Sequence, residues 1–432
     1  MKNITIVNGW HDLNTGDSAI IISMIKQINK KIKNFKVNII SELNSENEYY
    51  ENSIDYIKDS FSKIEINLVE SCFRKKYSGI CLKEIFDLVK NFIILCLPKK
   101  LVKFLLKHNE YYITINSSDA ILSKGGHFIF DRNGFKGLIH LYKCLYPMLL
   151  AHKLGKKYFI ISQSIGPLYD KSRNVFSKIS FKLSYYVLKN ADAISLRETV
   201  SFNNLKKLGL NNINNTGDYA FMLDNENKLP DELNKIINKN DFVVITVRQH
   251  NFKRNTETNY LNTIEKIANY VNKKYSYNVV FTAHVKGPNK FEDDRIVVEN
   301  IKNKFVNPNF IFLTDQYSPQ VICKFYSYAK LMIGTRFHSV IFALSNCVPA
   351  IAISYSGYKA NIMKQFNLDD FMIDIEDVNI DNENKIECMI DKLLDKKLDY
   401  KNIIKKCKKD VVNSIEDDFS LNKALGINYG EK

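Results

Sequence analysis

The chain has no apolar run that approaches the ~20 residues needed to cross a bilayer as a helix. Its first residues run directly into the strand-like segment Ile4–Val7, so we expect no secretory leader. The eight cysteines form no C-x-x-C pair, and several lie in apolar segments. We therefore expect reduced thiols and a cytoplasmic protein.

Other absences narrow the function. No His, Cys and carboxylate residues recur at the spacing of a metal site, and no nucleic-acid-binding motif is present. The chain carries 62 Lys and Arg against 47 Asp and Glu, a net charge of +15 that favours acidic small molecules or anionic lipid as partners. Because the lysines are scattered among Asn and Ile, we expect no nucleic-acid partner, and we expect no metal and no cofactor.

The hydrophobic pattern predicts an α/β protein. Hydrophobic residues make up 45% of the 432 residues, enough for two or more domains. Short continuous apolar runs alternate with longer helical patterns, as expected for parallel strands covered on both faces. These runs are Ile4–Val7, Val37–Ile40, Ala120–Ser123, Tyr158–Ser162, Ala193–Leu196, Phe242–Val247, Val279–Thr282, Phe310–Leu313, Leu331–Ile333 and Ala350–Ser354.

We interpret the chain as two doubly wound Rossmann-like lobes that face a central cleft. The first strand series ends at about residues 213–218, and the polar stretch 224–240 separates it from the second. The expected domains are an N-terminal acceptor-side lobe, a C-terminal donor-side lobe and a helical tail (1–224, 241–385 and 386–432). Ligands bind at the carboxyl ends of parallel strands, so the turns after the strands are candidate sites.

The segment Leu331–Leu344 is the most informative of these turns. Its sequence, LMIGTRFHSVIFAL, predicts a buried strand, a tight turn and a buried helix. The first amides of a helix have no intrahelical partner and favour anions. Arg336 offers a planar fork for phosphate or carboxylate, and His338 can exchange a proton near neutral pH. A structural turn with a surface Arg and a capping His is an equally good interpretation.

The turn after the first strand, residues 8–19, contains Gly16 and Asp17. Gly16 permits a close backbone approach, and Asp17 could act as a base or accept a sugar hydroxyl. Helix capping by Asp17 is the simpler interpretation.

Two further turns of the first half carry polar or small residues. The SKGGH turn places Gly125, Gly126 and His127 after a strand, which indicates a ligand near the backbone or a tight turn. The SQSIGP turn places Gln163 and Ser164 where they could donate to a polar ligand.

In the second half, Arg248 and His284 follow strands in a similar way. Arg248 is a candidate second anion ligand or a solvated loop residue. The acidic residues 292–294 are expected on a solvated helix face.

Residues 85–108 form the sequence IFDLVKNFIILCLPKKLVKFLLKH, in which apolar residues alternate with five lysines. A basic amphipathic helix of this kind can lie on an anionic membrane surface. The alternative is a core-facing helix with a solvated lysine face.

Taken together, these turns resemble the polysaccharide pyruvyl transferase family over about residues 1–370. The matching pieces occur in the family's order: Asn14–Ala19, Lys124–Gly126, Ser162–Pro167, Leu196–Glu198, Gly217–Asp218, Arg248, Gly334–Ser339, Val348–Pro349 and Ser354–Tyr355 with Lys359. Phe337 stands where the family usually has Leu, and His127 where a third Gly is common.

The resemblance implies a fold like that of the B-type glycosyltransferases. It also implies transfer of pyruvate from phosphoenolpyruvate to two hydroxyls of a cell-surface polysaccharide sugar or its precursor, which forms a ketal. Arg336 and His338, with Phe337 and Ser339 beside them, would line the donor pocket. Either Arg248 or Arg197 would supply a second guanidinium. The acceptor would be a lipid-linked or nucleotide-activated sugar, reached from the cytoplasmic face of the plasma membrane.

On this hypothesis His338 is the acid, and Asp17 orients or deprotonates the acceptor hydroxyl. Losing one such contact costs about 2.7–4 kcal/mol, so we expect Arg336→Ala and His338→Ala each to lower turnover roughly a hundredfold without unfolding. The competing hypotheses are a B-type glycosyltransferase that uses a nucleotide sugar and a non-catalytic module of a polysaccharide-assembly complex.

Overall fold

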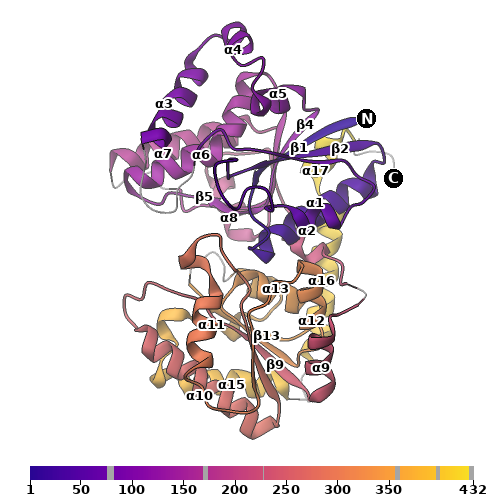
Figure 1. Cartoon of the computed structure of the whole chain (residues 1–432), viewed down its shortest axis with the longest axis vertical. Helices are drawn as coiled ribbons and strands as arrows, with labels where there is room; N and C mark the ends of the chain where they lie inside the picture. Colours follow the sequence, from indigo (N-terminus) through magenta and orange to yellow (C-terminus); the bar gives the residue numbers. More distant parts are fainter. Residues whose placement is uncertain (75–81, 169–173, 227, 356–360, 396–398, 428–432) are drawn as a thin grey trace. The chain divides into compact units, whose positions relative to one another are not determined.

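The computed structural model describes residues 1–74, 82–168, 174–226, 228–355, 361–395 and 399–427, which form two compact units (Figure 1). Unit 1 contains residues 1–12, 20–219 and 413–432, and unit 2 contains residues 13–19 and 220–412. Each unit is built on a parallel sheet, so the α/β prediction is confirmed.

Unit 1 has a sheet with the strand order β3-β2-β1-β4-β6-β7-β8, and β5 pairs with β6. From β1 the strands that follow in sequence are added first on one side, as β2 and β3, and then on the other side, beginning with β4. The carboxyl ends of β1 and β4 therefore form a topological switch point. The strands are β1 (Lys2–Gly9), β2 (Phe35–Ser41), β3 (Ile66–Val69), β4 (Ala120–Ser123), β5 (Gly126–Ile129), β6 (Tyr158–Ile165), β7 (Ala193–Leu196) and β8 (Ile213–Asn215).

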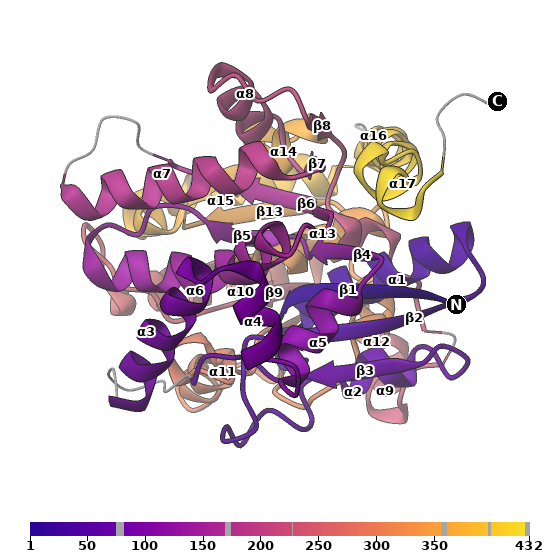
Figure 2. The ribbon, with the colours of Figure 1, turned by 90° about the horizontal axis from the view of Figure 1, so that it is seen from above.

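Helices cover the sheet of unit 1, and α6 and α7 lie side by side (Figure 2). The last helix of the chain, α17, packs against β4, β6 and β7. The helices are α1 (Thr15–Lys31), α2 (Asp55–Asp59), α3 (Leu82–Cys96), α4 (Lys99–Leu105), α5 (Glu110–Ser117), α6 (Gly134–Lys153), α7 (Val175–Asn190), α8 (Thr199–Lys207) and α17 (Phe419–Leu425).

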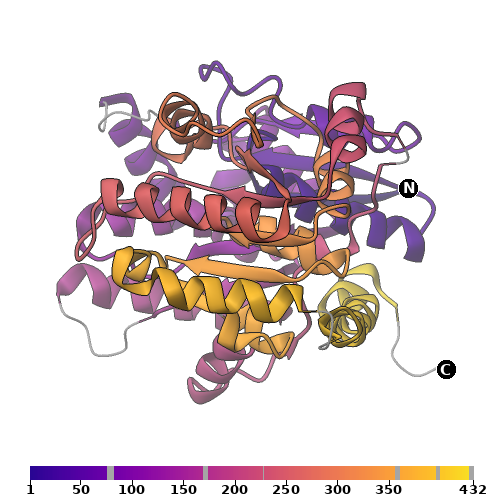
Figure 3. The ribbon, with the colours of Figure 1, turned by 90° about the horizontal axis from the view of Figure 1, so that it is seen from below.

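Unit 2 has the strand order β11-β10-β9-β12-β13-β14, with a switch point between β9 and β12. Helices α10 and α15 run side by side (Figure 3). The strands are β9 (Phe242–Thr246), β10 (Asn278–Thr282), β11 (Phe310–Leu313), β12 (Leu331–Gly334), β13 (Ala350–Ser354) and β14 (Met372–Asp374). The helices are α9 (Asp231–Lys239), α10 (Glu257–Tyr275), α11 (Asp294–Lys302), α12 (Pro319–Tyr326), α13 (Phe337–Ser345), α14 (Asn361–Gln365), α15 (Glu383–Leu394) and α16 (Tyr400–Glu416).

All ten predicted strands are present, because continuous apolar runs are buried on both faces of the two sheets. Strands β3, β5, β8 and β14 are not among these ten runs, and each has only three or four residues; β8 lies where the first strand series was expected to end. Two segments lie in a different unit from the lobe or tail expected for them. Residues 13–19 belong to unit 2, and residues 413–432 belong to unit 1. Seven of the eight cysteines are free, and Cys81 lies outside the described residues.

Candidate active site

The switch point of unit 2 brings together two loops that the sequence singled out. Arg248 follows β9, and Arg336 follows β12 and caps the start of α13. Thr246 at the end of β9 connects the two loops by a hydrogen bond, because its hydroxyl accepts from the backbone N–H of Thr335 at 2.9 Å. The Thr335 hydroxyl in turn donates to the backbone oxygen of Thr246 at 2.7 Å. The positions of both arginines are therefore fixed by neighbouring strands.

The start of α13 has the tight strand-to-helix turn that the sequence predicts. A Cβ on Gly334 would lie 2.5 Å from Val340 Cγ2, so the turn requires glycine at this position. Ser339 donates its hydroxyl to the backbone oxygen of Arg336 at 2.6 Å. The Phe337 ring packs edge-on against His338, with the ring centroids 5.3 Å apart. In the first turn of α13 the backbone N–H of Ser339 donates to the Arg336 carbonyl oxygen at 3.1 Å. The positive end of the helix dipole favours an anion at this place.

Arg336 is buried and is held by a carboxylate. Its Nε lies 3.0 Å from each oxygen of Asp294, and its Nη2 lies 2.6 Å from Oδ1 and 2.8 Å from the Glu292 carbonyl oxygen. Burial alone would lower the pKa of Arg336, but Asp294 outweighs burial and raises it. Nη1 makes no hydrogen bond to any residue that the structure describes, and it remains available to a ligand.

The expectation of a solvated acidic face at residues 292–294 is wrong for Asp294, which is 0% exposed. Asp294 begins α11 and shares its buried face with Val297, Val298 and Ile301. This i, i+3, i+4, i+7 spacing was readable in the sequence and could have identified Asp294 as a buried partner for a cation.

Three more basic side chains surround this ion pair. Arg248 is 8% exposed, and its guanidinium carbon lies 3.9 Å from the centroid of the Tyr355 ring. Burial lowers the pKa of Arg248, although Tyr355 opposes the shift, and the neighbouring charge of Arg336 lowers it further. Lys286 is 1% exposed, and burial lowers its pKa to about 8.

His284 is the fourth basic group and is neutral near pH 7. Burial lowers its pKa well below the usual value, and the nearby His338, Lys286 and Arg336 lower it further. Two arginines and one lysine therefore lie around the buried carboxylate of Asp294, and Glu292, Asp293 and Asp315 act on them from less buried positions. Because the buried cations outnumber the buried carboxylates in this cluster, it favours an anionic ligand.

Residues 13–19 complete this cluster from the start of α1. Thr15 donates its hydroxyl to the backbone oxygen of His284 at 2.8 Å. Gly16 lies directly against His338, since a Cβ on Gly16 would be 2.1 Å from the Nδ1 of that ring. Asp17 is the next residue and lies in the first turn of α1, half-buried. The structure thus brings Gly16 and His338, predicted from separate turns, against each other.

The remaining candidate residues of the first half lie in unit 1. A Cβ on Gly125 would be 2.7 Å from the Ser162 carbonyl oxygen, and Gly126 has a φ of +151°, so both positions favour glycine. His127 Nε2 lies 2.6 Å from the Gly166 carbonyl oxygen, and its ring stacks on Phe130.

Arg197 is also in unit 1, where it is buried and hydrogen-bonded to two side chains. It donates to Ser164 Oγ at 2.7 Å and to Asp218 Oδ2 at 2.6 Å. Arg248, in contrast, lies in the same unit as Arg336. Gln163 is 0% exposed, and its amide has no hydrogen-bond partner within the described ranges.

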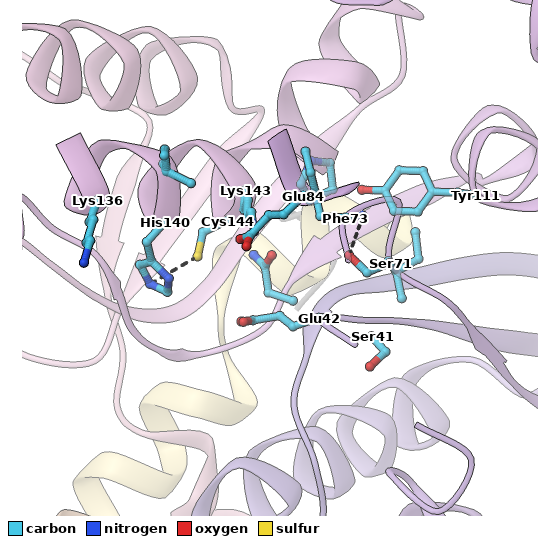
Figure 4. A pocket seen from close by; sticks show the side chains of 14 residues that line it. Ser41, Glu42, Ser71, Phe73, Glu84, Tyr111, Lys136, His140, Lys143 and Cys144 are labelled. Carbon is cyan, nitrogen blue, oxygen red and sulfur yellow. Dashed lines mark hydrogen bonds and ion pairs between the residues drawn. The ribbon is translucent and has the colours of Figure 1, made fainter. Parts of the chain in front are cut away.

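Unit 1 also contains a cavity of about 270 Å³ that the sequence did not indicate (Figure 4). It lies beside the ends of β1 and β2 and is bounded by α3 and α6. Polar side chains dominate one part of its wall, among them Asn8, Ser41, Glu42, His140 and Lys143. Such groups can bind the hydroxyls of a sugar. Ser41 and Glu42 come directly at the end of a predicted strand, which was a usable signal.

Three residues of the unit 2 site were not among the candidate residues, namely Lys286, Asp294 and Tyr355. Lys286 follows the same strand as His284 and could have been found by the same argument. Tyr355 occurs in a family motif, but its place over Arg248 depends on tertiary packing. Lys359 of that motif lies outside the described residues. Within the described ranges, no group of three or more His, Cys, Asp or Glu side chains is placed to hold a metal ion.

Comparisons with known proteins indicate what the chain is similar to. A family model for polysaccharide pyruvyl transferase matches residues 14–357. The amylovoran biosynthesis protein AmsJ of Erwinia amylovora is 24% identical over 385 residues, which is 84% of this chain and 86% of AmsJ.

Solved structures share the fold. A putative UDP-N-acetylglucosamine 2-epimerase from Listeria monocytogenes aligns with a TM-score of 0.62 and 13% identity over 98% of this chain and 95% of its own. UGT2 of Phytolacca americana, complexed with UDP-2-fluoro-glucose and pterostilbene, aligns with a TM-score of 0.55 and 10% identity over 99% of this chain and 98% of its own. The fold is therefore like that of the B-type glycosyltransferases, as expected.

Proposed function

The chain belongs to the polysaccharide pyruvyl transferase family, and we propose that it transfers pyruvate from phosphoenolpyruvate to two hydroxyls of a sugar, forming a cyclic ketal. The family and the relative AmsJ support a transferase role in exopolysaccharide synthesis. The donor assignment depends on one observation above all. The switch point of unit 2 holds more buried cations than carboxylates, and phosphoenolpyruvate carries both a phosphate and a carboxylate.

Arg248, Lys286 and the start of α13 are the proposed anion ligands. The face of the Arg248 guanidinium rests on Tyr355, and its Nε donates to the Gln249 carbonyl oxygen at 2.9 Å. This stacking leaves the remaining N–H groups, in the plane of the guanidinium, for an anion. Arg336 contributes Nη1 while Asp294 fixes its orientation.

His338 is the proposed acid, and Asp17 is the proposed base. His338 donates a proton to the methylene carbon of the donor, which leaves positive charge at C2. One sugar hydroxyl attacks C2 and gives up its proton to Asp17. The second hydroxyl then forms its bond to C2 as the C2–O bond to phosphate breaks. The products are the ketal and inorganic phosphate, and the two hydroxyl protons balance those taken up by the methylene carbon and the leaving group.

The acceptor sugar is assigned to the unit 1 cavity, because its hydroxyl and carboxylate groups suit sugar hydroxyls (Figure 4). This assignment would apply to a lipid-linked or a nucleotide-activated acceptor.

Isothermal titration calorimetry tests the donor assignment. We expect phosphoenolpyruvate to bind, UDP-sugars to bind more weakly, and Arg248→Ala to weaken phosphoenolpyruvate binding by roughly a hundredfold. Arg254→Ala is the matched control, because that arginine lies on the same loop and is 65% exposed. Tight binding of UDP-sugars without phosphoenolpyruvate binding would instead support a glycosyltransferase. Phosphate release from phosphoenolpyruvate with a sugar acceptor would exclude a non-catalytic role.

A further inference from the structure

Helix α3 packs on unit 1 with its polar face inward. Glu84 pairs with Lys143 of α6, and Asp87 pairs with Arg74 at 2.7 Å between Oδ1 and Nη2. Asn91 donates to a backbone carbonyl oxygen at 3.1 Å. These charged and polar contacts occupy the positions where an ordinary surface helix places its apolar stripe.

Ile94 of α3 and Val102 of α4 are buried, but other large apolar residues of the two helices face solvent. Phe86, Phe92 and Phe104 are between 61% and 67% exposed, and Val89, Ile93 and Leu105 lie beside them at helical spacing with 49–56% exposed. We call these six residues the α3–α4 face; both helices lie at the outer edge of unit 1 (Figure 1). The alternative of a core-facing helix with a solvated lysine face holds only in part, since Ile94 and Val102 join the core while these six apolar residues do not. Exposed large apolar side chains gathered on two successive helices indicate an interaction site.

The charge around this face has one sign. Between residues 82 and 108 the only carboxylates are Glu84 and Asp87, and both are buried. All six lysines of this range are exposed. Lys100, Lys103 and Lys107 line a cavity of about 550 Å³ together with polar residues of α5. Three ammonium groups around one cavity beside exposed phenylalanines suit lipid phosphates whose acyl chains lie next to them.

We propose that the α3–α4 face binds the surface of an anionic phospholipid bilayer. The phenylalanines enter the boundary between headgroups and acyl chains, and the three lysines of the α4 cavity bind lipid phosphates. Among the described residues, no helix is long and apolar enough to cross a bilayer, so the contact is peripheral. A second copy of the chain fits this face less well, since it would bring lysines against lysines. The inference does not rest on the donor or the reaction.

Co-sedimentation of the full chain with vesicles tests the proposal. We expect binding to vesicles with 30 mol% phosphatidylglycerol and at least tenfold weaker binding to pure phosphatidylcholine. The triple variant Phe86→Ser/Phe92→Ser/Phe104→Ser should bind anionic vesicles at least tenfold more weakly. The same positions changed to Leu should retain binding, which separates loss of apolar contact from loss of fold.

The charge is tested by changing Lys100, Lys103 and Lys107 to Gln. We expect this variant to bind at least tenfold more weakly than a control with Lys235, Lys239 and Lys304 changed to Gln, three exposed lysines of unit 2. Circular dichroism checks that each variant is folded. Equal binding to both vesicle types, or unchanged binding by both triple variants, would overturn the proposal. So would a light-scattering result in which the wild type is a dimer and the Phe→Ser variant a monomer.

Discussion

Breaking the Arg336–Asp294 ion pair should destabilise unit 2 far more than breaking an exposed pair. The two side chains are 7% and 0% exposed, and the pair is bidentate. Removal of one partner leaves an uncompensated buried charge, which costs about 3–5 kcal/mol. For a unit of roughly 200 residues this corresponds to a fall in Tm of about 6–20 °C. The sequence led us to expect that Arg336→Ala leaves the fold intact. From the structure we expect this substitution to destabilise unit 2.

The test is a double-mutant cycle measured by urea unfolding. We expect Arg336→Met and Asp294→Leu each to lower the free energy of unfolding by about 3–5 kcal/mol, and the double variant to lose clearly less than the sum of the two single losses. Arg254→Ala is the control, since it breaks a pair that is 65% and 45% exposed and should cost no more than about 1 kcal/mol.

The double variant also separates stability from binding. It should fold and yet bind phosphoenolpyruvate roughly a hundredfold more weakly, because the ordered guanidinium is gone. Additive losses in the double variant, or single losses below about 1 kcal/mol, would refute the reasoning from the buried pair. Full binding by the folded double variant would remove Arg336 from the donor site.

Three other predictions concern the same site. Burial lowers the pKa of Lys286 to about 8, so its charge is lost as the pH rises through that value. The affinity for phosphoenolpyruvate, measured by calorimetry, should therefore fall by up to about tenfold per pH unit above pH 8. An affinity that does not change with pH would exclude Lys286 as a ligand of the donor. In Gly16→Ala the new methyl group overlaps the His338 ring, so the rate of phosphate release should fall at least about tenfold. Circular dichroism should show that this variant is folded. A wild-type rate would contradict the packing of Gly16 against His338. His338→Ala and Asp17→Asn should each lower phosphate release roughly a hundredfold while phosphoenolpyruvate still binds, and loss of binding alone would give these residues a different role.

The strands and the strand-end turns of the candidate site could be predicted from sequence because both follow local rules. Continuous apolar runs mark buried parallel strands, and residues just after them lie at the carboxyl edge of the sheet. These rules predicted the ten strands and singled out Arg248, Arg336 and His284 as residues of strand-end turns.

Long-range pairing was not readable in the same way. The sequence does not say that Asp294 binds Arg336, since the two are 42 residues apart and meet only through tertiary packing. Nor does it say that Gly16, early in the chain, lies against His338 in the second unit. Whether the apolar face of α3 points outward or into the core stayed open in the sequence for a related reason. A helical pattern shows which residues share a face, but only their partners decide which face is buried.

A crystal soaked with phosphoenolpyruvate measures the central claim most directly. We expect the donor at the unit 2 switch point, with its phosphate and carboxylate on Arg248, Lys286 and the first amides of α13, and with its methylene carbon next to His338. A donor bound elsewhere, or a UDP-sugar that occupies this place while phosphoenolpyruvate does not, would contradict the account.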